Sequence, residues 1–310
     1  MSEATTGWQR TRVYRNHHLD STRWDAIEPR DGDVVITTSY KSGTTWTQGI
    51  VGQLLLQGVA DPPPLMALSP WVDARFMFPL DALVAMLAAQ PHRRFLKSHL
   101  PADGLPYRSS TRYIVVGRDA RDVFMSLVNH YAAYTDAALA AFNDDPSLPR
   151  FERFDGDVKK LWRQWTTQGY FEWESEGAPW WGNLQHTASY WPHRDAENVL
   201  FVHYADLQAD LPGEVRRIAS FLGVGATQEQ AEHIARECRI DRMREVASKD
   251  HDGLATFFEG GAQRFFFRGT NGRWRDVLDD EDLALYEAAK ERVLPPDCAE
   301  WLERGFRGRP

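Results

Sequence analysis

A lysine, a glycine and several hydroxyl side chains gather in one short stretch, residues 37–50, which reads TTSYKSGTTWTQGI. The stretch follows an apolar run and continues in the spacing of one helix face. A helix that begins just after Gly43 points its unpaired N–H groups and the positive end of its dipole back toward that glycine. Donor groups for an oxyanion come from a set of neighbours: Lys41, Ser42, Thr44 and Thr45. The stretch predicts a phosphate-binding loop; the alternative is a Ser/Thr helix cap beside a surface lysine.

The loop differs from the P-loop of nucleoside-triphosphate-binding proteins, because the pattern G-x-x-x-x-G-K-[ST] does not occur in the sequence. A nucleoside triphosphate with Mg²⁺ is therefore not the first choice of ligand. Asp119 follows the strand-like run YIVVGR and suggests the Mg²⁺ ligand of a P-loop protein. The lysine of the P-loop pattern, which such a site needs, is missing. Cys238 and Cys298 lack the spacing of a zinc site. The sequence thus predicts no metal.

Strand-like and helix-like segments alternate along the chain. Four β-branched or aromatic runs predict strands: DVVITT (33–38), RRFLKS (93–98), RYIVVG (112–117) and NVLFVHY (198–204). Helical spacing of apolar residues predicts helices at 46–55, 122–134 and 213–223. This alternation implies an α/β fold with a central, mostly parallel sheet flanked by helices, whose ligands bind at the carboxyl ends of the strands. We expect long loops that cover a site at residues 61–71, 143–157 and 248–263.

Composition sets the limits of the function. The formal net charge of −8 argues against a surface devoted to nucleic acid, so basic residues are expected in a local pocket for an anion. A chain of 310 residues can bury one large core, and we predict a single domain over residues 1–310. Apolar runs such as ALVAMLAA (82–89) are too short to span a bilayer, and the first twenty residues lack the apolar core of a signal peptide. Two cysteines make no disulfide framework, which favours a reducing cytoplasm.

Five segments, in order, resemble the cytosolic-type sulfotransferases, which use 3′-phosphoadenosine 5′-phosphosulfate (PAPS) as sulfuryl donor. SYKSGTTW is similar to their 5′-phosphosulfate loop, although Tyr40 stands where the family usually has proline. The other similar segments are FLKSHLP, VVGRDARDVFMSL, VHYADL with the later FLG, and FFFRGTNGRW. The resemblance implies a P-loop-like phosphosulfate-binding loop in an α/β domain. It also implies PAPS as co-substrate without a metal.

The resemblance implies a role for each matched residue. His99 is implied as the catalytic base, Lys41 as the stabiliser of the leaving phosphate oxygen, and Lys97 as the residue that orients the sulfonate. The expected donor-binding residues are Lys41, Ser42, Gly43, Thr44, Thr45, Trp46, Arg118, Ser126, Tyr204, Arg268 and Gly269. For Trp46, stacking on adenine and a place in the core stay equal alternatives. Phe267 replaces a basic residue of the family pattern, so one charge expected at the 3′-phosphate is missing.

The function we predict is transfer of a sulfuryl group to a hydroxyl, or as second choice an amine, of a small apolar or aromatic acceptor. Aromatic residues expected to wall the acceptor are Trp71, Phe76, Phe78, Tyr131, Tyr134, Trp180, Trp181, Phe257 and Phe258. The alternatives are a P-loop kinase and a catalytically silent nucleotide-binding homologue. The segment RDVLDDEDLALYE (275–287) lacks the threonine–valine core of the dimer segment of animal relatives, so the oligomeric state stays open, with a homodimer as one option.

Overall fold

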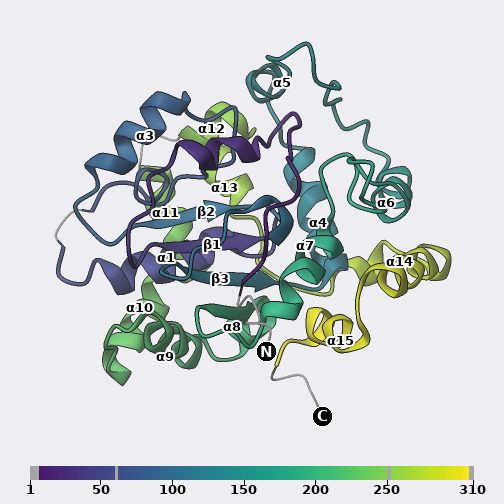
Figure 1. Ribbon diagram of the computed structural model, residues 1–310. Coiled ribbons are helices and arrows are strands. Elements are labelled where there is room, and N and C mark those ends of the chain that lie inside the picture. Colours follow the sequence, from purple (N-terminus) through teal and green to yellow (C-terminus); the bar gives the residue numbers. More distant parts are fainter. Residues whose placement is uncertain (1–6, 60–61, 250–252, 307–310) are drawn as a thin grey trace, which may run out of the picture.

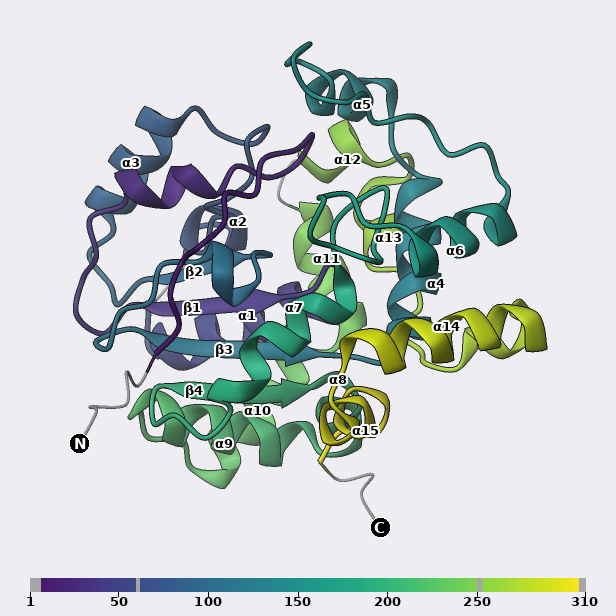
Figure 2. The same ribbon diagram turned by 45° about the vertical axis from the view of Figure 1, so that its right-hand side comes forward.

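Four parallel strands form the centre of the molecule. The computed structural model describes residues 7–59, 62–249 and 253–306. Its sheet has the order β2-β1-β3-β4, with β1 at Val34–Thr38, β2 at Phe95–Ser98, β3 at Arg112–Gly117 and β4 at Val199–His203 (Figures 1 and 2). All three strand pairings are parallel. The four predicted strands and the predicted α/β fold with one central sheet are confirmed.

Helices connect the strands and cover the sheet. The longer α-helices are α1 (Thr44–Leu55), α3 (Leu80–Ala89), α4 (Ala120–Tyr131), α6 (Val158–Thr167), α7 (Asn183–Tyr190), α9 (Leu211–Leu222), α10 (Gln228–Glu237), α11 (Ile240–Lys249), α14 (Asp280–Val293) and α15 (Pro296–Arg304). The shorter ones are α2 (Leu65–Leu68), α5 (Asp136–Phe142), α8 (Tyr204–Ala209), α12 (Gly253–Phe257) and α13 (Gly261–Phe265). Single 3₁₀ turns occur at Ser21–Ala26, Ala102–Gly104, Trp191–His193 and Arg273–Asp276.

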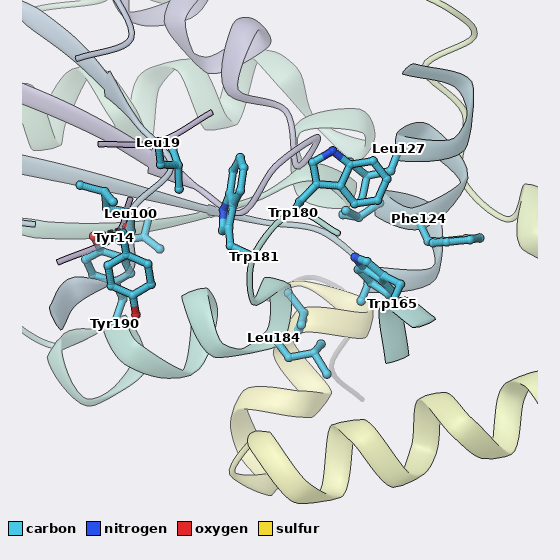
Figure 3. Packing of buried hydrophobic residues seen from close by; sticks show 14 of the residues in the cluster. Tyr14, Leu19, Leu100, Phe124, Leu127, Trp165, Trp180, Trp181, Leu184 and Tyr190 are labelled. Atoms are coloured by element: carbon cyan, nitrogen blue, oxygen red, sulfur yellow. Dashed lines mark hydrogen bonds between the residues drawn. The ribbon is translucent and has the colours of Figure 1, made fainter. Parts of the chain in front are cut away.

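Both faces of the sheet are buried, because alternate residues of each strand enter different cores. On β1, Val34 and Ile36 belong to the core that α1, α9 and α10 complete, whereas Val35 belongs to the larger core on the other face. Strands β3 and β4 alternate in the same way. Figure 3 shows part of the larger core, where Trp180 lies beside Leu127 of α4 and Trp181 lies nearer Leu19 and Leu100. This double burial explains why the strands read as continuous apolar runs.

The strand register aligns the carboxyl ends at one edge of the sheet. Thr37 pairs with Ser98, Thr38 with Val116, and Gly117 with His203. The chain runs from β1 outward to β2 and then returns to pair β3 on the other side of β1, so the order reverses between β1 and β3. In open α/β sheets, ligands bind at such a switch point. The residues that follow the strands therefore meet there.

One expectation about loops is wrong. Within residues 248–263 the described part folds into the end of α11, all of α12 and the start of α13. Phe257 of α12 packs on Phe142 of α5, and Phe258, which follows α12, packs on His130 of α4. Residues 143–157 are irregular as expected, and 62–71 contain only the short α2. Residues 61 and 250–252 lie outside the described ranges. Among the described residues, no helix has the length and apolar character that crossing a membrane requires.

Candidate active site

The loop between β1 and α1 has a backbone that only a few residues tolerate. Gly43 has φ 110°, and a Cβ added there would lie 2.9 Å from Cδ2 of Tyr204. Lys41 has φ 67°, in the left-handed region that side chains other than glycine rarely adopt. Helix α1 begins at Thr44, as the sequence predicts. The close packing explains the glycine, and the strained lysine marks the loop as a functional candidate.

The loop hydroxyls hold the loop in place. The Oγ atoms of Ser42 and Ser39 lie 2.6 Å apart, and the Oγ1 atoms of Thr44 and Thr38 lie 2.7 Å apart, all four residues being buried. Thr45 is half-buried. The sequence predicted these hydroxyls as anion donors, but in the structure Ser42 and Thr44 bond within the protein. The free N–H groups of the first turn of α1 are the remaining anion donors.

His99 has one ring nitrogen occupied and one free. Its Nδ1 lies 2.8 Å from the carbonyl oxygen of Thr38, and because a carbonyl only accepts, Nδ1 carries the proton. Nε2 therefore presents a lone pair, and this buried atom has no partner among the described residues. Burial, together with the nearby charge of Lys97, holds the pKa of His99 well below its usual value. The imidazole is neutral and ready to accept a proton.

Lys41 and Lys97, both half-buried, place two amines near His99. Burial, Lys97 and Arg118 lower the pKa of Lys41 to about 7, and burial lowers that of Lys97 to about 8. The Nζ atom of Lys97 lies 4.4 Å from the ring centre of Trp71. No salt bridge of either lysine occurs in the described part of the chain. Two partly desolvated amines without a salt bridge favour the binding of an anion beside them.

Asp73 is a site residue that the sequence did not reveal. Its Oδ2 accepts hydrogen bonds from the backbone N–H of His99 at 3.0 Å and from Nε1 of Trp71 at 2.7 Å. Its Oδ1 accepts from Nε1 of Trp24 at 3.2 Å. Burial raises the pKa of Asp73. The carboxylate fixes the position of His99, and its only sequence signal is the W-x-D spacing to Trp71.

Arg118 follows β3 and reaches the last loop of the site. Its Nη2 donates to Oδ1 of Asn271 at 2.9 Å and to the carbonyl oxygen of Thr270 at 3.2 Å, and its guanidinium lies 4.1 Å from the ring centre of Tyr204. Tyr204 in turn donates to the carbonyl oxygen of Gly269 at 3.1 Å. The structure thus brings together three of the predicted donor-binding residues.

Two other predicted residues lie nearby. Trp46 is half-buried, with its ring centre 5.2 Å from that of Tyr204 and a buried Nε1 that has no partner among the described residues. Ser126 is half-buried on α4, and no hydrogen bond of its side chain occurs in the described ranges. A free indole N–H beside Tyr204 favours a contact with a ligand over a role in packing alone.

Helix α13 and the segment that follows it carry a cluster of arginines, which we call the Phe267 arginines: Arg264, Arg268 and Arg273. Their guanidinium carbons lie 5.6, 5.2 and 5.2 Å from the ring centre of Phe267. Arg268 is exposed, and Gly269 has φ 64°. The Nε of Arg273 is buried without a partner in the described ranges, and burial with the charge of Arg118 lowers the pKa of Arg273. Sequence comparison with the family pattern missed Arg273, because the pattern has no basic residue there.

The predicted acceptor wall divides into two groups. Around His99, the ring centres of Trp71 and Trp181 lie at 4.7 and 6.1 Å, and that of Tyr40 at 5.1 Å. Phe76, Tyr134, Phe257 and Phe258 continue this group outward. Phe78, Tyr131 and Trp180 instead pack elsewhere: Phe78 joins the small core of α3, and Tyr131 packs on Trp180 at 5.2 Å.

Asp119 is not available as a metal ligand. Its Oδ1 accepts the backbone N–H of Arg121 at 2.9 Å and caps α4, and its Oδ2 pairs with the Arg121 guanidinium at 2.7 Å. Across the described ranges, no group of three His, Cys, Asp or Glu side chains is arranged to hold a metal ion. The charged groups of this site are mainly cationic, as an anionic ligand requires.

Comparisons with known proteins identify the class. The family model described as "Sulfotransferase domain" matches residues 31–294. The "Glycolipid sulfotransferase" of Mycobacterium bovis is 35% identical over 96% of this chain and 95% of its own length. Human "Sulfotransferase 2A1" is 26% identical over 94% of this chain and 95% of its own length. The chain belongs to the sulfotransferase family and is a sulfotransferase, as the five motifs predicted.

Solved structures support the fold. Mouse sulfotransferase SULT7A1 complexed with PAP has a TM-score of 0.65 at 18% identity and covers 90% of each chain. Retinol dehydratase in complex with androsterone and inactive cofactor PAP has a TM-score of 0.65 at 22% identity, covering 92% of this chain and 87% of its own. At these identities the likeness concerns the fold alone.

Proposed function

We propose that this sulfotransferase takes the sulfuryl group from PAPS and transfers it to a hydroxyl of a small apolar or aromatic acceptor, an amine being the second choice. The observation that carries the proposal is the Nε2 of His99, which has no partner among the described residues, close to two half-buried lysines. His99 accepts the acceptor's proton as the new O–S bond forms. The bond between sulfur and the bridging oxygen breaks in line, and its electron pair stays on the nucleotide phosphate.

Lys41 and Lys97 neutralise the charge that moves. Lys41 donates to the bridging oxygen as negative charge develops there, and Lys97 orients the sulfonate oxygens. A sulfuryl group carries less negative charge than a phosphoryl group, so two ammonium groups can take the place that Mg²⁺ has in phosphoryl transfer. No metal ion is part of this proposal. Burial lowers the pKa values of both lysines, and an anion beside them raises these values.

The donor nucleotide lies along the switch point of the sheet in this proposal. The first turn of α1 and the backbone of residues 41–45 hold the 5′-phosphosulfate. Trp46 and Tyr204 contact the adenine. Arg118, Ser126, Arg268 and the backbone of Gly269 hold the 3′-phosphate, and Arg273 supplies the cation that Phe267 does not. The buried, unpartnered Nε of Arg273 supports this last assignment.

The aromatic group around His99 supports an apolar or aromatic acceptor. The hydroxyl of a glycolipid is the second candidate, because a relative at 35% identity is named a glycolipid sulfotransferase. Both candidates have a hydroxyl next to apolar surface. In a glycolipid a sugar carries this hydroxyl, whereas the small acceptor has no sugar. The working compartment, which we predict to be the cytoplasm, stays a prediction.

A transfer assay with radiolabelled PAPS tests the proposal. Phenols, hydrophobic alcohols, amines, free oligosaccharides and glycolipids are offered as acceptors, and the labelled product is separated. We expect the highest kcat/KM with a phenol, a hydrophobic alcohol or a glycolipid. A strong preference for a free oligosaccharide would contradict the acceptor proposal and leave the donor unchanged.

Calorimetry with 3′-phosphoadenosine 5′-phosphate (PAP) tests the donor assignment. A sulfotransferase that uses PAPS binds PAP, the nucleotide that remains after transfer. We expect tight binding of PAP that does not need Mg²⁺, and much weaker binding of AMP, which lacks the 3′-phosphate. Equal affinity for the two nucleotides would contradict the assignment of Arg118, Ser126 and Arg273.

A further inference from the structure

A buried chain of hydrogen bonds connects the loop lysine to the N-terminal segment. It runs through six side chains and ends on a backbone carbonyl, in the order Lys41, His130, Tyr40, Tyr134, His18, His17 and Pro179 O. The first three contacts are 3.2, 3.0 and 3.2 Å, and Tyr134 Oη to His18 Nε2 is 3.5 Å. The two neighbouring histidines contact each other through their Nδ1 atoms. Apart from Lys41 and the rings of Tyr40 and Tyr134, which belong to the aromatic group around His99, none of these side chains has a role in the proposed function.

The contact of His17 with Pro179, at the end of this series of hydrogen bonds, determines which atom donates in each of the others. Nε2 of His17 lies 2.8 Å from the carbonyl oxygen of Pro179, which can only accept, so this nitrogen carries the proton. Burial lowers the pKa of His17 to about 3, so the ring is neutral and its Nδ1 accepts. His18, whose pKa burial also lowers, then donates from Nδ1 and accepts at Nε2.

The direction continues to the active site. Tyr134 donates its hydroxyl to Nε2 of His18, so its oxygen accepts from the hydroxyl of Tyr40. The oxygen of Tyr40 in turn accepts from Nε2–H of His130. Burial and the charge of Lys41 hold the pKa of His130 well below its usual value, so its ring is neutral. The Nδ1 lone pair of His130 therefore faces the Nζ atom of Lys41 at 3.2 Å.

We propose that His130, held in one tautomer by Tyr40, is the positioning residue for the Lys41 ammonium. One N–H of Lys41 donates to His130, and the other two are left in a fixed direction for the donor's phosphosulfate. The proposal rests on the proposed role of Lys41. The ring of Phe265 lies 4.7 Å from Nζ and closes the apolar side of the amine. The hydroxyl of Tyr40, the residue that departs from the family pattern, thus has the role of holding His130 in this tautomer.

The neutral acceptor also keeps Lys41 charged. The titratable groups that face Lys41 are Lys97 and His99 from the end of β2, Arg118 from the end of β3, and His130 from α4. The two cations disfavour the ammonium, whereas the lone pair of His130 favours it. Removing that lone pair lowers the pKa of Lys41 further. The alkaline limb of the rate profile, where Lys41 loses its proton, then moves to lower pH.

The test compares His130→Leu, which removes the acceptor, with His130→Asn, whose Oδ1 takes the place of Nδ1. We expect His130→Leu to lower kcat about 10- to 100-fold, to leave the affinity for PAP within a few-fold, and to move the alkaline limb to lower pH. His130→Asn should restore most of kcat and of the pH profile. Tyr40→Phe should lower kcat less than His130→Leu, because the ring of His130 remains.

Tyr131→Phe is the matched control, because this tyrosine shares α4 with His130 but donates to the carbonyl of Glu152, outside the chain of hydrogen bonds. Its kcat should equal that of the wild type. If a folded His130→Leu keeps the wild-type kcat and pH profile, or if His130→Asn loses as much as His130→Leu, the proposal is wrong.

Nitrogen NMR of the histidine rings tests the chain without turnover. We expect the Nε2–H tautomer for His130, identified by its loss in His130→Asn, and the Nδ1–H tautomer for His99. Finding Nδ1–H on His130 would overturn the proposal. If the wild type transfers no sulfuryl group, the proposed function fails by itself, and the tautomers still decide whether the chain holds Lys41 as described.

Discussion

At the scale of single residues, a substitution of His99 is expected to affect catalysis and not donor binding. Its Nε2 has no partner among the described residues, whereas its Nδ1 and its backbone N–H are hydrogen-bonded to Thr38 and Asp73. We expect His99→Ala to lower kcat by about 10²- to 10⁴-fold, the usual contribution of a positioned base, with the Kd for PAP nearly unchanged. Turnover with labelled PAPS and calorimetry measure the two quantities.

His92→Ala is the control, because His92 contacts the backbone of Arg93 and the ring of Phe95, at the start of β2 and away from His99. It should leave both quantities as in the wild type. Near-normal turnover of His99→Ala on the best acceptor would show that another group is the base.

Moving the positive charge from position 273 to position 267 tests the role proposed for Arg273. If Arg273 supplies the cation that the family pattern places at position 267, Arg273→Gln should weaken PAP binding about 10-fold or more and leave AMP binding nearly unchanged. Adding Phe267→Arg to this variant should restore much of the affinity. Calorimetry with both nucleotides measures the difference.

Arg275→Gln is the matched control, since the exposed Arg275 stacks on Trp274 at 4.4 Å and not on Phe267. It should bind PAP as the wild type does. An equal loss for PAP and AMP in Arg273→Gln would place this arginine away from the 3′-phosphate.

The sequence predicts residues whose role depends on the motif around them, such as His99 after a strand and Gly43 before a helix. It could not predict Asp73, His130 or Arg273. The role of each depends on a neighbour far away in the chain: His99 for Asp73, Lys41 for His130, and Arg118 for Arg273. Such contacts appear only when the strands align.

At the scale of elements, the β1–α1 loop packs directly on the start of α8. A Cβ at Gly43 would contact the rigid ring of Tyr204 at 2.9 Å, and φ 110° is unfavourable for any other residue. We expect Gly43→Ala to cost about 1–3 kcal/mol of stability and to weaken PAP binding at least 10-fold, because loop and ring must separate. Thermal unfolding and calorimetry test this.

Gly58→Ala is the matched control, because Gly58 has φ 79° but no atom within 4 Å of an added Cβ. It should share the backbone strain and keep the affinity for PAP. Wild-type affinity in Gly43→Ala would contradict the tight contact with Tyr204.

The elements themselves were predictable where one signal dominated. All four strands are buried apolar runs, and α1, α4 and α9 have clear helical spacing with capping by Gly43, Asp119 and Gly223. The helices α12 and α13 were expected as loop, because each has only five residues and no full period of helical spacing. Phe257 of α12 packs on α5 and Phe265 of α13 packs on α4, a tertiary effect that local propensity does not express.

At the scale of the whole molecule, the partly desolvated Lys97 lowers the stability of the enzyme without donor. Burial lowers the pKa of Lys97 to about 8 in the folded state from its ordinary value of 10.5, so between these values the unfolded state binds more protons. Stability contributed by this group therefore rises with pH from about 8 to about 10.5. We expect Lys97→Met to raise the Tm at pH 7, to flatten this rise, and to abolish turnover.

Lys160→Met is the control, since Lys160 is exposed and pairs with Asp155. It should leave the pH dependence of the Tm unchanged between pH 8 and pH 10. If Lys97→Met is no more stable than the wild type at pH 7, Lys97 does not lower the free energy of unfolding, and this prediction is wrong.

The parallel strand order β2-β1-β3-β4 affects how the protein folds. No strand pairs with its partner through a hairpin, and the last site loop contacts Arg118 across 152 or more residues of chain. Contacts of such sequence separation form late and together, and they make folding slow. We therefore expect the ability to bind donor to appear in a single cooperative step at the end of folding, so that no fragment ending before residue 272 has a share of it.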